Sequence, residues 1–135
     1  MTDKEPLKNR WSRALMTGSA FVNAFIGLAL IFLPQEAATA IGMHLPAPEH
    51  TLFFQLGGAA YLGFGLLNYT GRGAILGGIY GKAILAGNWI FHLVASITLL
   101  RSLFDLGFQL LLTLLAMIYI SFAIGFIVLN YRSAA

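Results

Sequence analysis

Polar side chains recur inside apolar stretches of this chain, at spacings that would bring them together in a helical protein. Each of four stretches carries one carboxamide, the third adds a histidine, and the fourth adds a threonine. These candidate binding residues are Asn23, Gln55, Asn88, His92, Gln109 and Thr113. Amide, imidazole and hydroxyl groups donate or accept hydrogen bonds, so in apolar surroundings they join helices or hold a polar group of a ligand.

His92 follows Asn88 by four residues, and Thr113 follows Gln109 by the same interval. Residues three or four apart share a helix face, so each pair is expected to point toward the same neighbouring helices. An ionisable residue inside a membrane segment is a functional candidate, which singles out His92. Two interpretations stay open. The polar groups form hydrogen bonds that fix helix packing, or they form a polar column, open toward the outside, that binds a ligand.

The residue inventory excludes several kinds of chemistry. The chain has no cysteine, so it has no disulfide, no thiolate metal site and no cysteine nucleophile. None of the four stretches contains Asp or Glu. The chain therefore lacks the buried carboxylate that a proton-coupled cation exporter uses, which argues against this class of protein. His44 and His50 lie outside the stretches, so neither a metal nor a cofactor is predicted. No serine–histidine–acid constellation is legible, so the inventory favours a non-enzymatic protein.

The elements that would position these residues are membrane helices. Of the 135 residues, 59% are hydrophobic and 10% are charged, whereas soluble domains have about 25% charged residues. A spanning helix needs about 20 apolar residues, and such stretches occupy residues 14–33, 51–70, 79–100 and 106–130. The sequence predicts an all-α polytopic membrane protein, a bundle of four transmembrane helices in a single domain, residues 1–135.

Two of the predicted connections have distinctive features. Residues 34–50 form the longest one, an outer loop in which residues 36–43 are expected to form a short helix in the membrane interface. Pro34 cannot easily continue a helix interior, so the first span is expected to end there. Residues 101–105 form a very short link, so the third and fourth spans are expected to be antiparallel neighbours.

Lysine and arginine are distributed unevenly over the two predicted sides. One side has Arg101 alone, and the other has Lys4, Lys8, Arg10, Arg13, Arg72, Lys82 and Arg132. Because basic residues concentrate in cytoplasmic segments, we expect both termini to be cytoplasmic, in a multi-pass protein of the inner (plasma) membrane. No basic stripe runs along one face, so the expected partner is the lipid bilayer and not a nucleic acid.

Small residues at four-residue spacing indicate where helices pack. Lipid tails give no hydrophobic drive for association between helices, so close contact depends on small and polar residues. The third span and the segment before it contain Gly73, Gly77 and Gly81, and the second span contains Ala59 and Gly63. We expect these residues to form helix-packing seams, either within the chain or between copies of it.

One stretch resembles a known group of proteins. It runs Gln55-Leu-Gly-Gly-Ala-Ala-Tyr-Leu-Gly-Phe-Gly-Leu-Leu-Asn68, and it is followed by Arg72 and by the helix with Asn88 and His92. This pattern resembles the DoxX-like small four-span bacterial membrane proteins, over all four spans. The resemblance implies a bacterial inner-membrane protein and transfers no catalytic residue.

Two functions follow from these observations. In the first, the chain is a non-enzymatic oligomeric or accessory subunit, which uses its glycine seams to bind another copy or a membrane protein partner. In the second, it binds or carries a small or lipidic molecule in a polar pocket around His92. A defined homo-oligomer or a copurifying partner would favour the first, and a cavity beside His92 would favour the second.

Overall fold

The computed structural model describes residues 4–73 and 79–134, and these residues form helices and connections without a strand. The helices are α1 (Lys4–Phe32), α2 (Pro34–Ala40), α3 (Pro48–Gly71), α4 (Ile79–Leu106) and α5 (Leu110–Ala134). Each of the four long helices covers most of one predicted span, although α1 ends at Phe32 and α5 begins only at Leu110. The all-helical fold class is therefore confirmed, with helix ends that extend beyond most of the predicted limits.

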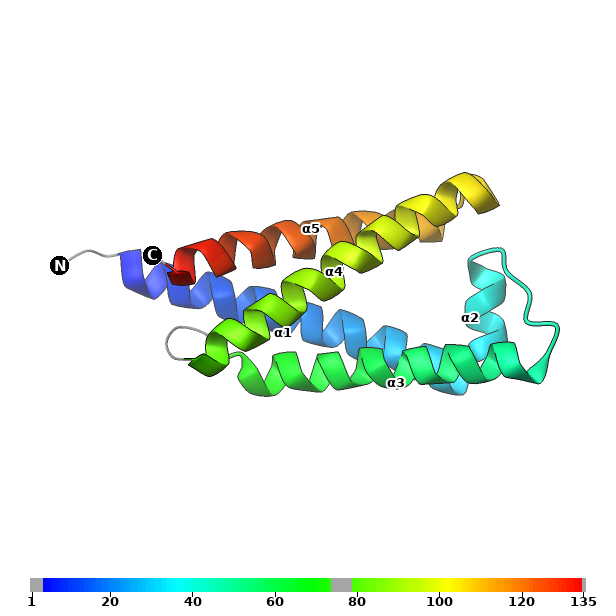
Figure 1. The fold of residues 1–135 in the computed structure, drawn as a ribbon, viewed down its shortest axis with the longest axis horizontal. Helices are drawn as coiled ribbons and strands as arrows, with labels where there is room; N and C mark the ends of the chain where they lie inside the picture. Colours follow the sequence, from blue (N-terminus) through cyan, green and yellow to red (C-terminus); the bar gives the residue numbers. More distant parts are fainter. Residues whose placement is uncertain (1–3, 74–78, 135) are drawn as a thin grey trace.

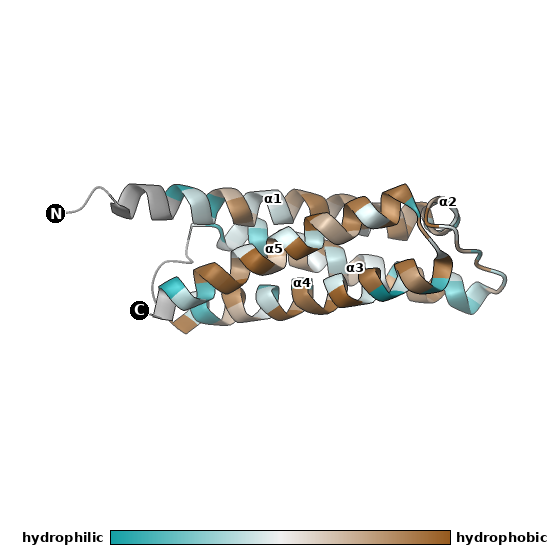
Figure 2. Ribbon diagram, turned by 90° about the horizontal axis from the view of Figure 1, so that it is seen from above, coloured by the Kyte–Doolittle hydropathy of each residue, from teal (hydrophilic) through white to brown (hydrophobic). Residues whose placement is uncertain are grey.

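Among the described residues, three helices are long and apolar enough to cross a membrane, which indicates a membrane protein. They are the Arg10–Phe32 part of α1, all of α4, and the Leu110–Arg132 part of α5. These helices carry exposed large apolar side chains, such as Phe25 and Phe104, which are 75% and 88% exposed. Apolar residues cover most of the length of the long helices in Figure 2. The second predicted span lies in α3, which is not among these three helices because Gln55, Asn68 and several glycines make it less apolar.

The long helices alternate in direction and form two pairs (Figure 1). α1 packs along α3, and α4 packs along α5, whereas contacts of α1 with α5 and of α3 with α4 are few. The short α4–α5 link does produce antiparallel neighbours, as the sequence predicts. The two pairs meet in the half of the molecule that holds both termini, where Met16 packs with Leu85, Phe126 and Leu129. In Figure 1 they diverge toward the end that carries α2.

Glycines allow α1 and α3 to pack with their backbones almost in contact. A Cβ atom added to Gly58 would lie 2.8 Å from the Gly27 carbonyl oxygen, and one added to Gly65 would lie 2.9 Å from the Ala20 carbonyl oxygen. Such distances leave no room for any side chain, so Gly27, Gly58 and Gly65 form the seam between these helices.

Within the chain, this seam differs from the one that Ala59 and Gly63 would form. Ala59 and Gly63 are exposed, and nothing lies within 4 Å of a Cβ added to Gly63. Gly73 lies in the turn after α3 and is exposed, Gly77 lies outside the described residues, and Gly81 is buried in α4. Within the chain, the seam therefore uses a neighbouring face of α3, because glycine and alanine fill four successive positions there and do not distinguish one face from the next. A seam of Ala59 and Gly63 between copies stays a prediction.

Proline and glycine residues mark the ends of helices in two of the connections. α1 ends at Phe32, and Pro34 begins α2, which covers a shorter stretch than the predicted residues 36–43. α4 continues through Arg101 and Asp105 to Leu106, so the link between α4 and α5 lies later in the chain than predicted. The exposed side chains of Arg101 and Asp105 approach each other to 3.9 Å. The chain then turns at Gly107, whose positive φ of 79° suits glycine at a helix C-terminus.

Candidate functional site

A reciprocal pair of asparagines joins the two helix pairs. Nδ2 of Asn68 in α3 donates to Oδ1 of Asn88 in α4 at 2.7 Å, and Nδ2 of Asn88 donates to Oδ1 of Asn68 at 2.6 Å. Asn68 also donates to the Ser19 hydroxyl oxygen in α1 at 2.9 Å. All three side chains are buried. One polar cluster thus links α1, α3 and α4 where apolar packing between the pairs is sparse.

Helical periodicity explains why these two asparagines meet. The buried residues of α3 are Gly58, Gly65, Asn68 and Gly71, at spacings of seven, three and three. Those of α4 are Gly81, Leu85, Asn88, His92 and Ser96, at spacings of four, three, four and four. Each set lies along one helix face. Gly58 and Gly65 on the α3 face pack against α1, and Gly71 lies against the Ile84 side chain of α4. Asn68 thus lies on a face of α3 that meets both neighbouring helices.

His92 lies one turn after Asn88, among aromatic rings. Its Nδ1 lies 2.8 Å from the Asn88 carbonyl oxygen, and the Ser96 hydroxyl donates to the His92 carbonyl oxygen at 2.6 Å. Because a carbonyl oxygen only accepts, Nδ1 carries the ring hydrogen, and Nε2 of the neutral ring has a free lone pair. The ring stacks on Phe126 at 5.0 Å and tilts against Tyr119 at 5.4 Å between centroids. Nε2 is buried and has no hydrogen-bond partner among the described residues.

Asn23 is joined to the other helix pair through Tyr119. The Tyr119 hydroxyl in α5 donates to Asn23 Oδ1 in α1 at 2.8 Å, and both side chains are buried. The second polar atom of this amide, Nδ2, has no hydrogen-bond partner in the described part of the chain. Asn23 and His92 therefore both lie close to Tyr119, and each has one unpaired polar atom.

The other predicted site residues do not join this cluster. Gln55 is exposed, and its Nε2 donates to the Ile31 carbonyl oxygen at 3.2 Å. Gln109 lies in the α4–α5 link with its side chain against Gly42 of the loop after α2, and the Thr113 hydroxyl donates to the Gln109 carbonyl oxygen. These residues are near the α2 end, where the two helix pairs diverge. The polar groups thus form a compact cluster and not the predicted column.

Sequence reasoning missed three members of the cluster as site residues. Asn68 is indicated only by the family resemblance, and Ser19 and Tyr119 are not among the candidate binding residues. The aromatic side chain of Tyr119 suits any apolar core. The available signal was the spacing from Gly65 to Asn68 to Gly71, which places Asn68 on a face of small residues.

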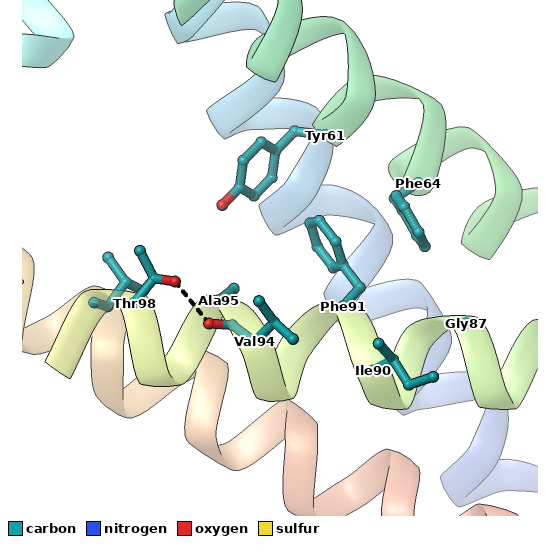
Figure 3. A pocket seen from close by; sticks show the side chains of 9 residues that line it. Tyr61, Phe64, Gly87, Ile90, Phe91, Val94, Ala95 and Thr98 are labelled. Atoms are coloured by element: carbon teal, nitrogen blue, oxygen red, sulfur yellow. Dashed lines mark hydrogen bonds between the residues drawn. The ribbon is translucent and has the colours of Figure 1, made fainter. Parts of the chain in front are cut away.

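Two apolar cavities adjoin the cluster on its α2 side. The first, here called the roofed cavity, has a volume of about 790 Å³ and lies between α1, α3 and α5 beneath α2; its lining includes Phe25, Ile41, Phe53, Gly57, Tyr61 and Leu115. The second, here called the side cleft, has about 550 Å³ and lies between α3 and α4. Figure 3 shows its lining, in which Tyr61 and Thr98 provide the hydroxyl groups.

The arrangement offers hydrogen bonding and apolar enclosure but no metal centre. No group of three or more His, Asp or Glu residues suited to a metal ion occurs within residues 4–73 and 79–134. No protein-family model, curated protein or solved structure matches this chain.

The asparagine pair predicts a measurable coupling energy. Asn68→Leu and Asn88→Leu should each destabilise the protein by about 1–2 kcal/mol, because hydrogen bonds between membrane helices contribute about 0.6 kcal/mol on average and each variant strands a buried amide. The double variant should lose clearly less than the sum of the two single losses. Unfolding in mixed micelles measures these values.

Gln55→Leu is the matched control, since it removes an exposed carboxamide from the same helix and should change stability little. Additive losses in the double variant, with no coupling between positions 68 and 88, would contradict the pairing.

Proposed function

We propose that the chain crosses the membrane four times, with α3 as the remaining span. α3 has 24 residues, a length of about 36 Å, against a hydrocarbon core of about 30 Å. α1 ends at the α2 end of the molecule, whereas α4 begins at the opposite end (Figure 1). If α1 and α4 both cross, the chain must return between them, and α3 is the helix available for that return.

The proposed orientation places both termini in the cytoplasm of a bacterial inner membrane. The start of α1 and the end of α5 lie at the same end of the molecule, together with the end of α3 and the start of α4 (Figure 1). Arg10, Arg13, Arg72, Lys82 and Arg132 belong to this end, and Arg101 to the other. This distribution supports the orientation through the preference of basic residues for cytoplasmic segments. The DoxX-like resemblance points to the same location and stays a prediction.

The function best supported by the geometry is binding of an apolar molecule within the membrane, without catalysis. The roofed cavity carries this proposal. Its volume of about 790 Å³ is in the range of small-molecule sites, which are mostly apolar with a few polar groups. It lies where the helix pairs diverge, so an apolar molecule can enter from the surrounding lipid.

A second candidate is an oligomeric or accessory subunit, which the exposed surface of α3 favours. Ala59 and Gly63 lie one turn apart on this surface, and nothing occupies the space beside Gly63. Small residues at this spacing allow a helix of another copy, or of a membrane protein partner, to approach closely. A smaller particle for Gly63→Leu than for the unchanged protein in detergent would support a homo-oligomer, and an unchanged particle would count against this face as its interface.

Labelling of introduced cysteines tests the topology, and the chain has no cysteine of its own. Glu36→Cys is on exposed α2, and Tyr131→Cys is exposed near the end of α5. A membrane-impermeant maleimide should label Glu36→Cys in intact cells and should label Tyr131→Cys only after the inner membrane is permeabilised. Labelling of both sites in intact cells would contradict four spans, since an even number of crossings between α2 and the end of α5 would be implied.

Photolabelling tests the binding site with a hexadecane analogue that carries a diazirine. Unlabelled hexadecane should compete for labelling of Ala40 and Ile41, which line the roofed cavity. Gly57→Leu should weaken this competition about tenfold, because an overpacked site costs 1–3 kcal/mol. Nothing lies within 4 Å of a Cβ added to Gly57, so the fold accommodates the change.

Gly63→Leu is the matched control, because Gly63 has the same free space in the same helix but does not line the cavity. Labelling that hexadecane cannot compete away in the unchanged protein would refute binding in this cavity. An equal effect of Gly57→Leu and Gly63→Leu would do the same.

A further inference from the structure

An apolar groove, here called the seam groove, lies along the seam between α1 and α3 and has a volume of about 330 Å³. Small residues form its floor, since a Cβ atom added to Gly65 would lie 2.9 Å from the Ala20 carbonyl oxygen and 3.0 Å from the Ala24 nitrogen. All its lining residues belong to α1 and α3, and two of them, Phe21 and Leu66, are exposed. The seam groove is therefore open to the surrounding lipid.

Tyr69 is the last residue of α3 that lines the seam groove, and its ring carries a guanidinium group. Phe21 meets this ring edge-on at 6.3 Å between centroids. The guanidinium carbon of Arg72 lies 3.7 Å from the ring centroid, and Arg72 also donates to the Tyr69 carbonyl oxygen. A guanidinium group has five N–H donors, so donors remain for another acceptor. One end of an apolar groove thus has a fixed positive charge.

Arg13 brings a second exposed guanidinium group to the same end. It precedes Ala20 by seven residues, as Arg72 follows Gly65 by seven, so each arginine is about two turns from the floor of the groove on the same helix face. Contacts between the helices fix their relative level. Met16 Cε would lie 3.7 Å from a Cβ added to Gly71, so Arg13 and Arg72 lie within about one helical turn of the same level.

We propose that the seam groove binds an anionic phospholipid. The phosphate lies between Arg13 and Arg72, and one acyl chain lies in the groove against Phe21 and Leu66. Guanidinium groups bind phosphate oxygens through paired hydrogen bonds, and tyrosine rings favour the headgroup level of a bilayer. Basic pockets between membrane helices on the cytoplasmic side are typical sites for anionic headgroups. This inference rests on the proposed topology and is independent of binding in the roofed cavity.

Other occupants match fewer of these features. A free phosphate would use the arginines but leave the apolar groove empty. A zwitterionic phospholipid has a cation beside its phosphate, which the two arginines would repel. A helix from a second copy would cover the groove but would supply no phosphate to the arginines.

Photolabelling of the unchanged protein in detergent micelles tests the inference, with a phosphatidylglycerol that carries a diazirine in one acyl chain. The label should attach to Phe21 and Leu66, and unlabelled phosphatidylglycerol should compete for this labelling. Phosphatidylcholine with the same acyl chains should need an approximately tenfold higher concentration, because it has no net charge. Inorganic phosphate should not compete, because it has no acyl chain.

Three of the possible results would overturn the inference. Equal competition by phosphatidylcholine would exclude recognition of charge, and displacement by inorganic phosphate would indicate a site for free anions. Absence of labelling in a dimeric particle would indicate that a second copy covers the seam groove. Binding in micelles does not depend on orientation in a membrane, so each of these results leaves the topology to the cysteine-labelling experiment.

Variants assign the charge preference to the two arginines. Arg13→Gln and Arg72→Gln should each weaken competition by phosphatidylglycerol about fivefold, the contribution of one basic residue near an anionic surface. Competition by phosphatidylcholine should change little. Lys82→Gln is the matched control, since it removes an exposed positive charge at the same end of the molecule, in a helix that does not line the groove. An equal loss in Lys82→Gln would indicate general attraction of charge and would contradict a defined site.

Discussion

The reciprocal hydrogen bonds between Asn68 and Asn88 are the constraint on which the shape of this protein depends. α1 with α3 and α4 with α5 are each close-packed, but the two pairs touch each other sparsely. Within a bilayer, lipid contacts a helix as favourably as another apolar helix does, so apolar surface alone does not draw the pairs together. The amide pair, with Ser19 on one side of it and the Asn23–Tyr119 bond in support, provides directional contacts across the interface.

The position of this cluster also explains the cavities. The pairs are held together on the side of the cluster where Met16, Leu85, Phe126 and Leu129 form an apolar core. Toward α2 no comparable polar bond joins them among the described residues, and they diverge around two apolar spaces. The hydrogen-bonded cluster thus holds the two helix pairs together on one side and leaves the cavities between them on the other. Two buried polar atoms, Asn23 Nδ2 and His92 Nε2, have no hydrogen-bond partner among the described residues.

Much of this architecture is legible in the sequence, and the failures have a common cause. The apolar stretches predict the helices, and the four-residue spacing of Asn88 and His92 correctly predicts a shared buried face. Hydrophobic periodicity, however, reports poorly on which face of a membrane helix is buried, because the lipid-facing side is apolar too. The sequence alone therefore does not show that Asn23 is buried and Gln55 exposed, or that Gly58 is buried and Ala59 exposed. Only the partner helix, through the close approach of Gly27 to Gly58, selects one face of α3. Asn68 becomes recognisable as a site residue once that face is known.

The central claim, that the asparagine pair fixes the separation of the two helix pairs, is tested most directly by a distance measurement. Spin labels on Leu52→Cys in α3 and Phe104→Cys in α4, both exposed positions, report the separation at the diverging end by double electron–electron resonance in lipid nanodiscs. We expect a single narrow distance distribution that broadens when Asn68→Leu and Asn88→Leu are introduced together. An unchanged distribution in that variant would show that apolar packing alone holds the pairs in place, and it would contradict the account.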